Sequence, residues 1–224
     1  MQNLIIFGGS GVGMIAASIA ESSGKYRIKG FLNDYLPINS KIGKYKKHKV
    51  LGRSADYTKF LNDKTNSFFF GYFGMGAEKK VFDKLLGLKI PTNRYANLIH
   101  PTASIPWDYI SFGNGILMGP HSQVSPDAKI SDNCIILGGA FIGHDSFMDR
   151  FSHVATNGVI GGSVHIGKGV HIGSNSTIRE KVRVGDFSLV GCGANVIVDI
   201  PMLSTFVGNP AKTLIKEIDN KKRY

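Results

Sequence analysis

Apolar residues recur at every sixth position through the second half of the chain. The series runs without a miss through Phe112, Met118, Val124, Ile130, Ile136, Ile142, Met148, Val154, Ile160, Ile166, Ile172, Ile178, Val184, Val190 and Val196. With 42% of the chain apolar, a given register would do this by chance with a probability of roughly two in a million. A period of six fits neither a helix nor a simple strand alternation.

Glycines and small side chains accompany this series. Glycine directly follows the apolar residue at positions 113, 119, 143, 161, 167, 173, 185 and 191, and the fourth residue after it is small except at Ile116 and Ile200. This is the hexapeptide repeat of a left-handed parallel β-helix, in which each short strand buries one aliphatic and one small residue. Three hexads close one triangular coil, and coils stack about 4.8 Å apart. Residues 18 apart in sequence are therefore expected to be stacked.

The first hundred residues follow a different pattern. Apolar strands are expected over residues 4–7, 27–32 and 67–71, with helices over 14–23 and 77–86, while 35–63 is polar and has no clear assignment. Strands that alternate with helices predict a small Rossmann-like parallel sheet. We expect an α/β domain over residues 1–98, an all-β β-helix over 99–203 that begins after a short strand near 95–99, and a tail over 204–224.

A glycine-rich loop connects the first strand to the first helix. Its residues are Gly8, Gly9, Ser10, Gly11, Val12 and Gly13. A buried strand, a glycine turn and a helix N-terminus together offer free backbone N–H groups to a phosphate. The spacing is not the dinucleotide fingerprint, because Met14 stands where the third glycine should be.

Two polar residues follow the second predicted strand. Asn33 and Asp34 stand at its carboxyl end, where open parallel sheets commonly bind ligands. We therefore expect the glycine loop, Asn33 and Asp34 to form one binding site.

The chain is strongly basic, with a formal net charge of +11. Part of the charge is concentrated at Lys41, Lys44, Lys46, Lys47, Lys49 and Arg53, and part in the tail at Lys221, Lys222 and Arg223. We interpret these clusters mainly as solvated surface. Binding of anionic small ligands is the second interpretation, and we expect no nucleic-acid partner.

Few features of the sequence indicate the cellular compartment of the protein. The two cysteines, Cys134 and Cys192, are not separated by a multiple of 18, so stacking does not pair them and no disulfide is expected. The chain lacks a basic-then-apolar leader and an apolar run of membrane-spanning length. We expect a cytoplasmic protein without membrane insertion.

Two histidines of the repeat carry candidate chemistry. None of the repeat's five histidines occupies a buried position of the hexad, so all five should point outward or lie at corners. His144 lies between Gly143 and Asp145, which places a carboxylate beside a potential proton acceptor. Gly162, one coil further, leaves space and a backbone N–H next to His144. His153 lies half a coil away, so the two histidines can share a site only across a subunit interface, as in a threefold trimer.

Several motifs together resemble one protein family. They are the glycine loop, the uninterrupted hexads, Ile142-Gly143-His144-Asp145, Phe151-Ser152-His153-Val154 and Val207-Gly208-Asn209-Pro210-Ala211-Lys212. This combination is similar to the PglD/NeuD family of trimeric sugar N- and O-acyltransferases over nearly the whole chain. Val12, Asp145 and Gly138 differ from residues common in the family, which bears on the sugar rather than on acyl transfer.

The resemblance implies roles for individual residues. His144 would be the general base, tuned by Asp145, and His153 of a neighbouring subunit would contact acetyl-CoA. Backbone around Gly162, Ser174 and Cys192 would line the cofactor groove. The nucleotide of a nucleotide-linked sugar would rest on the loop from Gly8 to Gly13 and on Asn33 and Asp34.

The expected reaction is direct transfer of the acetyl group of acetyl-CoA to the amine of a nucleotide-linked 4-amino-4,6-dideoxy sugar, for bacterial surface glycan synthesis. Three alternatives stay open. One is O-acetylation of sialic acid or another glycan sugar. Another is a metalloenzyme of the β-helix carbonic anhydrase kind, with His153 and His171 as stacked ligands and His144 or His165 of a neighbouring subunit as a third. The last is a trimeric binding protein without catalysis.

Overall fold

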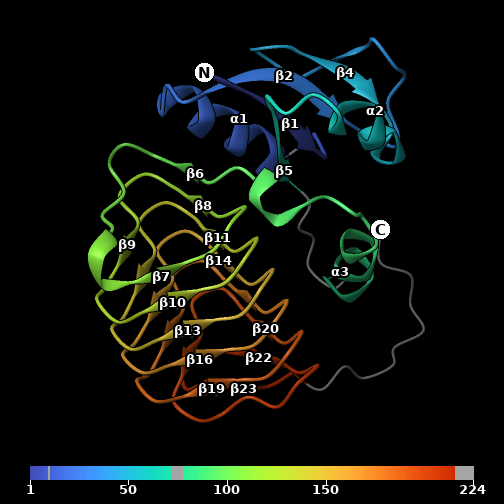
Figure 1. The fold of residues 1–224 in the computed structure, drawn as a ribbon. Helices are drawn as coiled ribbons and strands as arrows, with labels where there is room; N and C mark the ends of the chain where they lie inside the picture. The colour runs from blue at the N-terminus through green and yellow to red at the C-terminus, as the bar shows by residue number, and fades with distance from the viewer. Residues whose placement is uncertain (10, 72–77, 215–224) are drawn as a thin grey trace, which may run out of the picture.

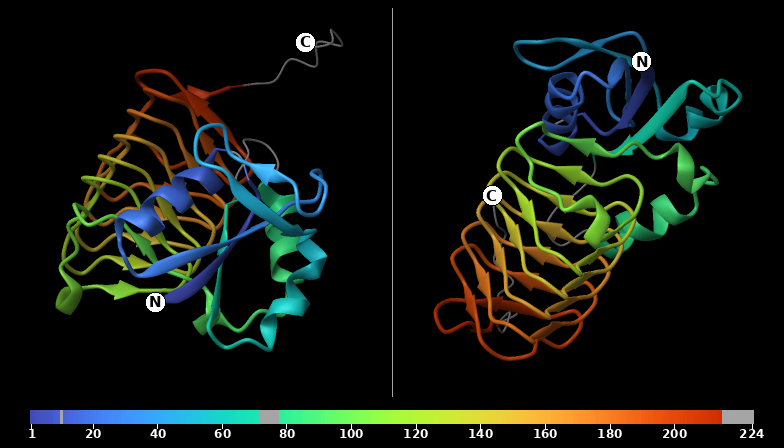
Figure 2. Two further views of the ribbon diagram at one scale, coloured as in Figure 1. Left: turned by 90° about the horizontal axis from the view of Figure 1, so that it is seen from above. Right: turned by 60° about the vertical axis from the view of Figure 1, so that its left-hand side comes forward.

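The structure, a computed structural model, describes residues 1–9, 11–71 and 78–214. A small α/β domain lies at one end of a triangular β-helix, as Figure 1 shows. Figure 2 shows the same arrangement from two further directions, with helix α1 (Val12–Ser22) lying over the first coils. The fold class expected from the sequence, a Rossmann-like domain followed by a left-handed β-helix, is confirmed.

The first domain is built on a five-stranded sheet of order β3-β4-β2-β1-β5. Its strands are parallel except for the pairing of β3 with β4. The strands are β1 (Gln2–Phe7), β2 (Tyr26–Leu32), β3 (Lys41–Ile42), β4 (His48–Gly52) and β5 (Asn66–Phe70). The remaining helical elements are η1 (Ser54–Tyr57), α2 (Thr58–Leu61), α3 (Glu78–Leu86) and η2 (Thr92–Arg94). Residues 35–63, which had no clear assignment from the sequence, thus form β3, β4, η1 and α2. Ala77, the first residue of the second expected helix, lies outside the described residues.

The β-helix has three faces of short parallel strands. After η3 (Trp107–Tyr109), the first face contains β7 (Ser111–Phe112), β10 (Lys129–Ile130), β13 (Phe147–Met148), β16 (His165–Ile166) and β19 (Arg183–Val184). The second contains β6 (Leu98–Ile99), β8 (Leu117–Met118), β11 (Ile135–Ile136), β14 (His153–Val154), β17 (His171–Ile172), β20 (Leu189–Val190), β22 (Thr205–Val207) and the antiparallel β23 (Lys212–Thr213). The third contains β9 (Gln123–Val124), β12 (Phe141–Ile142), β15 (Val159–Ile160), β18 (Thr177–Ile178) and β21 (Asn195–Val196).

Each repeat strand pairs with the strand one coil further along the chain. His153 is in register with His171, for example, so the expected stacking of residues 18 apart is confirmed. Turns separate the faces. We call the turn from the third face to the first the base corner (143–146, 161–164 and 179–182), and the turn from the second face to the third the opposite corner (137–140, 155–158, 173–176 and 191–194).

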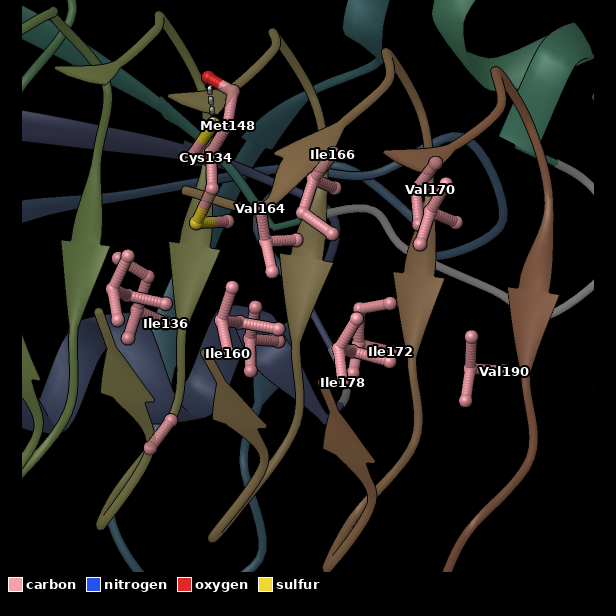
Figure 3. Packing of buried hydrophobic residues seen from close by; sticks show 14 of the residues in the cluster. Cys134, Ile136, Met148, Ile160, Val164, Ile166, Val170, Ile172, Ile178 and Val190 are labelled. Atoms are coloured by element: carbon pink, nitrogen blue, oxygen red, sulfur yellow. Dashed lines mark hydrogen bonds between the residues drawn. The ribbon is translucent and has the colours of Figure 1, made fainter. Parts of the chain in front are cut away.

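The apolar residue of each hexad points into the β-helix. All fifteen are buried except Phe112, which is partly buried and packs against the same core. Figure 3 shows this packing, with Ile136, Ile160 and Ile178 among the aliphatic side chains drawn. Because burying one such side chain stabilises a fold by roughly 1.5–3 kcal/mol, the repeat supplies its own core.

The first domain covers part of the second face from outside. Ala16 and Ala20 of α1 share a hydrophobic cluster with Leu98, Leu117 and Ile135, whose side chains point away from the interior of the β-helix. These residues are fully buried. The outward side of this face near the first domain is therefore a domain interface rather than solvent-exposed surface.

Both cysteines are free thiols, as expected. Cys134 is buried and donates to the carbonyl of Asp149 at 3.2 Å, and burial raises the pKa of its thiol to about 12. Cys192 is exposed.

Among the described residues, none of the helices has the length and apolar character needed to cross a bilayer.

Candidate active site

His144 and Asp145 form a dyad at the base corner. The turn after β12 places both side chains in solvent, and Asp145 takes the left-handed conformation with φ of 59°. Nδ1 of His144 lies 2.7 Å from Oδ2 of Asp145. A carboxylate at Nδ1 orients the ring and leaves Nε2 as the nitrogen that accepts a proton from a substrate.

Gly162 lies one coil further, and the imidazole of His144 packs against it. A Cβ at position 162 would lie 2.7 Å from Nε2 of His144, a distance that real Cβ atoms do not adopt. The ring can therefore occupy this position only because residue 162 has no side chain. The amide of Ser163 donates to the carbonyl of His144 at 2.8 Å, which fixes the stacking of the two turns. Within the described part of the chain, the amide N–H of Gly162 donates to no acceptor.

Ser174 and Cys192 lie elsewhere on the β-helix. Both are at the opposite corner, across the third face from His144. Cys192 is exposed and Ser174 is partly buried. A single chain therefore brings Gly162 to His144 but does not bring these two residues there.

His153 points outward from the interior of the β-helix, as expected, but its side chain is buried. Only 6% of His153 is exposed. It follows Ile135 in the outward column of the second face, next to the part covered by the first domain. Its ring packs edge-on against His171, with centroids 4.7 Å apart. Burial, with a smaller contribution from the charge of His171, lowers the pKa of His153 to about 3.

The pair of His153 and His171 is the one required by the metalloenzyme alternative. Among the described residues, no group of three His, Cys, Asp or Glu side chains has an arrangement that could hold a metal ion.

The glycine loop turns tightly between β1 and α1. Gly8, Gly9 and Gly11 have φ of 108°, 156° and 52°, backbone conformations that favour glycine. Gly11 is the residue before the helix and makes no side-chain capping bond, and its carbonyl accepts from the amide of Met14 at 3.1 Å. Val12 and Gly13 begin the helix, with Gly13 buried, and Ser10 lies outside the described residues.

Asn33 belongs structurally to this loop. Its Nδ2 donates to the carbonyl of Gly8 at 3.1 Å, and its Oδ1 accepts from the amides of Tyr35 and Leu36 at 2.9 Å each. A Cβ at Gly9 would collide with Ile42 of β3 and approach Asn33. The structure therefore brings Asn33 and the glycine loop together, as expected, with β3 closing over them.

Asp34 points away from the loop. Its carboxylate accepts from the amide of Ser54 at 2.8 Å, from the Ser54 hydroxyl at 3.0 Å and from Nζ of Lys84 at 2.6 Å. Burial alone would raise the pKa of Asp34, but the hydrogen bonds from Lys84 and Ser54 outweigh it, and the pKa is lowered. This carboxylate connects β2 to η1 and α3, a role that the sequence did not reveal for Ser54 or Lys84.

A second feature missed in the sequence lies on the first face. Lys129, Phe147, His165 and Arg183 are stacked in register, with Nζ of Lys129 5.6 Å from the Phe147 ring and the Phe147 and His165 rings 4.9 Å apart. Beside them is a cavity of about 410 Å³ lined by residues that include His165, Arg183 and Asp199 but not His144. The spacing of 18 residues in this column is visible in the sequence.

Comparison with known proteins fits this geometry. Residues 3–82 match the PglD N-terminal domain family. The acetyltransferase domain of PglB from Neisseria gonorrhoeae is 26% identical and superposes with a TM-score of 0.80, covering 96% of this chain and 100% of that domain. The same domain has been solved in complex with acetyl coenzyme A. The fold and the dyad thus define a hexapeptide-repeat acyltransferase architecture, and the resemblance to PglD/NeuD-type sugar acyltransferases is confirmed.

Two further proteins share parts of this architecture. A perosamine N-acetyltransferase from Caulobacter crescentus, solved with CoA and GDP-perosamine, has the same fold at 20% identity, with a TM-score of 0.82 and coverage of 96% and 98% of the two chains. The acyl-[acyl-carrier-protein]–UDP-N-acetylglucosamine O-acyltransferase of Pseudomonas aeruginosa is 27% identical over 101 residues. That match takes in 45% of this chain and spans only 39% of the relative's length.

Proposed function

We propose that this protein transfers the acetyl group of acetyl-CoA to the amino group of a nucleotide-linked amino sugar. The observation that carries the proposal is the exposed His144–Asp145 dyad, whose imidazole packs against Gly162. It is supported by the similarity to the PglB acetyltransferase domain, which binds acetyl coenzyme A. Because acetyl-CoA and nucleotide sugars are made in the cytoplasm, we place the reaction there.

The geometry supports a direct transfer. Nε2 of His144 accepts a proton from the sugar amine as the amine nitrogen attacks the thioester carbonyl. The amide of Gly162 donates to the oxygen of the tetrahedral intermediate. The intermediate then collapses, the carbon–sulfur bond breaks, and the CoA thiolate takes the proton from the imidazolium. Asp145 holds the ring in place throughout.

The first domain supplies the site for the sugar nucleotide. The loop of Gly8, Gly9, Ser10, Gly11, Val12 and Gly13 holds the pyrophosphate where it enters α1, and Asn33 fixes the loop. The amide of Gly8 is not part of this contact, because it donates to the carbonyl of Leu32 at 2.9 Å. Asp34 contributes through its bonds to Ser54 and Lys84, which set the position of the segment after β2.

The active unit is a homotrimer in this proposal. Gly162 and His144 lie on one edge of the third face, and Ser174 and Cys192 on the other. The third face between them carries Phe141 and Val159, each 36% exposed. If three third faces surround a common axis, the base corner of one subunit meets the opposite corner of the next. Acetyl-CoA then binds between them, with His153 of the neighbouring subunit contributing to its contacts.

O-acylation is the second candidate, because relatives that the chain matches over 101 residues are O-acyltransferases of a UDP-linked sugar. A thiol-release assay with acetyl-CoA separates the two. We expect turnover with at least one UDP-, dTDP- or GDP-linked 4-amino-4,6-dideoxy sugar and none with the corresponding 4-hydroxy sugars or with sialic acid. Turnover with the hydroxyl substrates alone would favour O-acylation, and no acetyl-CoA consumption with any acceptor would argue for a binding protein.

A further inference from the structure

Exposed apolar side chains gather along one outer edge of the first domain. Between β2 and β4 the chain leaves the sheet and returns as the edge strand β3. Tyr35 and Tyr45 are each 90% exposed, Ile38 is 54% exposed and Leu36 is 38% exposed. We call residues 35–49 the basic strip, because lysines are interleaved with these side chains.

The lysines of the basic strip carry largely uncompensated charge. Lys41 and Lys49 lie directly opposite each other on β3 and β4, an arrangement that costs rather than contributes stability. Lys46 pairs with Glu21 at 2.6 Å. Among the described residues, Lys41, Lys47 and Lys49 make no ion pair, and Nζ of Lys44 lies 5.3 Å from the Tyr45 ring.

Protection of the exposed sheet edge against pairing with other chains explains only part of this surface. Lysines on an edge strand prevent pairing with other chains, which accounts for Lys41 and its neighbours. It does not account for two fully exposed tyrosines and an exposed isoleucine. The inner side of the strip is well packed, since Ile42 is buried against the glycine loop and His48 stacks on Phe31 at 5.5 Å. The outward side chains of the basic strip are therefore attached to a well-packed part of the first domain.

We infer that the basic strip docks on the surface of a bilayer that contains anionic lipids. Lysines near such a surface are attracted to the headgroups, and tyrosines favour the membrane–water interface. Ile38 and Leu36 add apolar area that a bilayer buries, whereas recognition of a nucleic-acid backbone uses no aliphatic side chains. The strip lies at the end of the molecule away from the last coils (Figure 1), so docking leaves the base corner accessible.

Vesicle co-sedimentation of the full chain tests this inference. We expect binding to phosphatidylcholine vesicles that contain phosphatidylglycerol, weakening with added salt, and no binding to phosphatidylcholine alone. Lys44→Gln with Lys47→Gln should weaken binding by roughly 25-fold, about fivefold per lysine. Ile38→Ser with Tyr45→Ser should also weaken it, with less dependence on salt.

The matched control is Lys64→Gln with Lys89→Gln, which removes the same charge at exposed positions outside the strip and should change binding little. All substituted side chains are exposed, and circular dichroism melts verify folding. An equal loss in the control variant, equal binding to uncharged vesicles, or wild-type binding by both strip variants would overturn the inference. Retention on heparin without retention on anionic vesicles would overturn it too, because a soluble polyanion would then be the ligand.

Discussion

Gly162 lies one coil beyond His144, and the missing side chain at Gly162 is what allows the imidazole to pack there. A Cβ at position 162 would lie 2.7 Å from Nε2. The orientation of the ring toward Asp145 therefore depends on the absence of a side chain at residue 162.

Gly162→Ala should therefore lower kcat by roughly tenfold to a hundredfold, because the ring must move out of its orientation toward Asp145. The melting temperature should change little, since His144 is exposed and moves without disturbing the core. His144→Ala alone should lower kcat by ~10² to 10⁴. In a double-mutant cycle Gly162→Ala should have little further effect once His144 is gone. Additive losses would mean that Gly162 acts independently of the base.

Much of the fold was predictable because the hexad pattern encodes it residue by residue. One buried aliphatic and one small side chain per hexad fix strand, turn and stacking together, so the register of His144 with Gly162 followed from counting alone. The burial of His153 did not follow. His153 occupies an outward position of the hexad, and the hexad pattern specifies only which side chains point inward.

The partners of Asp34 were unpredictable for a similar reason. Its position after a parallel strand correctly placed it at the carboxyl edge of the sheet, beside Asn33. Ser54 and Lys84, which bind its carboxylate, come from segments 20 and 50 residues away. The column of Lys129, Phe147, His165 and Arg183, by contrast, has the coil spacing and was accessible from sequence.

Asp34→Ala should weaken both the fold of the first domain and sugar binding. Removing a carboxylate that accepts three hydrogen bonds leaves Ser54 and Lys84 without this acceptor, at a cost of about 1–3 kcal/mol in the free energy of unfolding. Steady-state kinetics should give a higher KM for the sugar nucleotide and an unchanged KM for acetyl-CoA. Ser54→Ala keeps the carboxylate and should cost less stability. Equal effects on the two KM values would mean that the first domain does not hold the sugar nucleotide.

His153 should make the protein sensitive to mild acid. Its pKa falls from an ordinary value of 6.5 to about 3, so between these values the unfolded chain binds a proton that the folded chain does not. Stability should thus be complete above pH 6.5 and decrease as the pH falls, by about 2 kcal/mol at pH 5. Chemical denaturation at pH 7.5 and pH 5 measures the difference.

His153→Leu should remove most of this loss, because leucine continues the apolar column of Ile135 and carries no proton. The exposed His121→Leu is the control and should keep the wild-type response. His48 and His165, whose pKa values are also lowered by burial, contribute equally to all three proteins. An unchanged acid response in His153→Leu would contradict the assignment of the titrating group.

Mixed trimers test whether the site is shared between subunits. The proposed site combines the base corner of one subunit with the opposite corner of the next, so His144→Ala and Ser174→Trp should each inactivate a trimer made of one variant. In trimers formed by co-expressing both variants in equal amounts, a site is intact only where a Ser174→Trp subunit supplies His144 and a His144→Ala subunit supplies Ser174. Random assembly places about a quarter of the sites in that state. The specific activity should recover to about a quarter of the wild-type value.

Co-expression of His144→Ala with Gly162→Ala is the matched control and should stay at the low level of the variants alone, because both changes lie on the same corner. If the first mixture is as inactive as the second, no active site combines His144 of one subunit with Ser174 of another, and the proposal of a shared site is wrong.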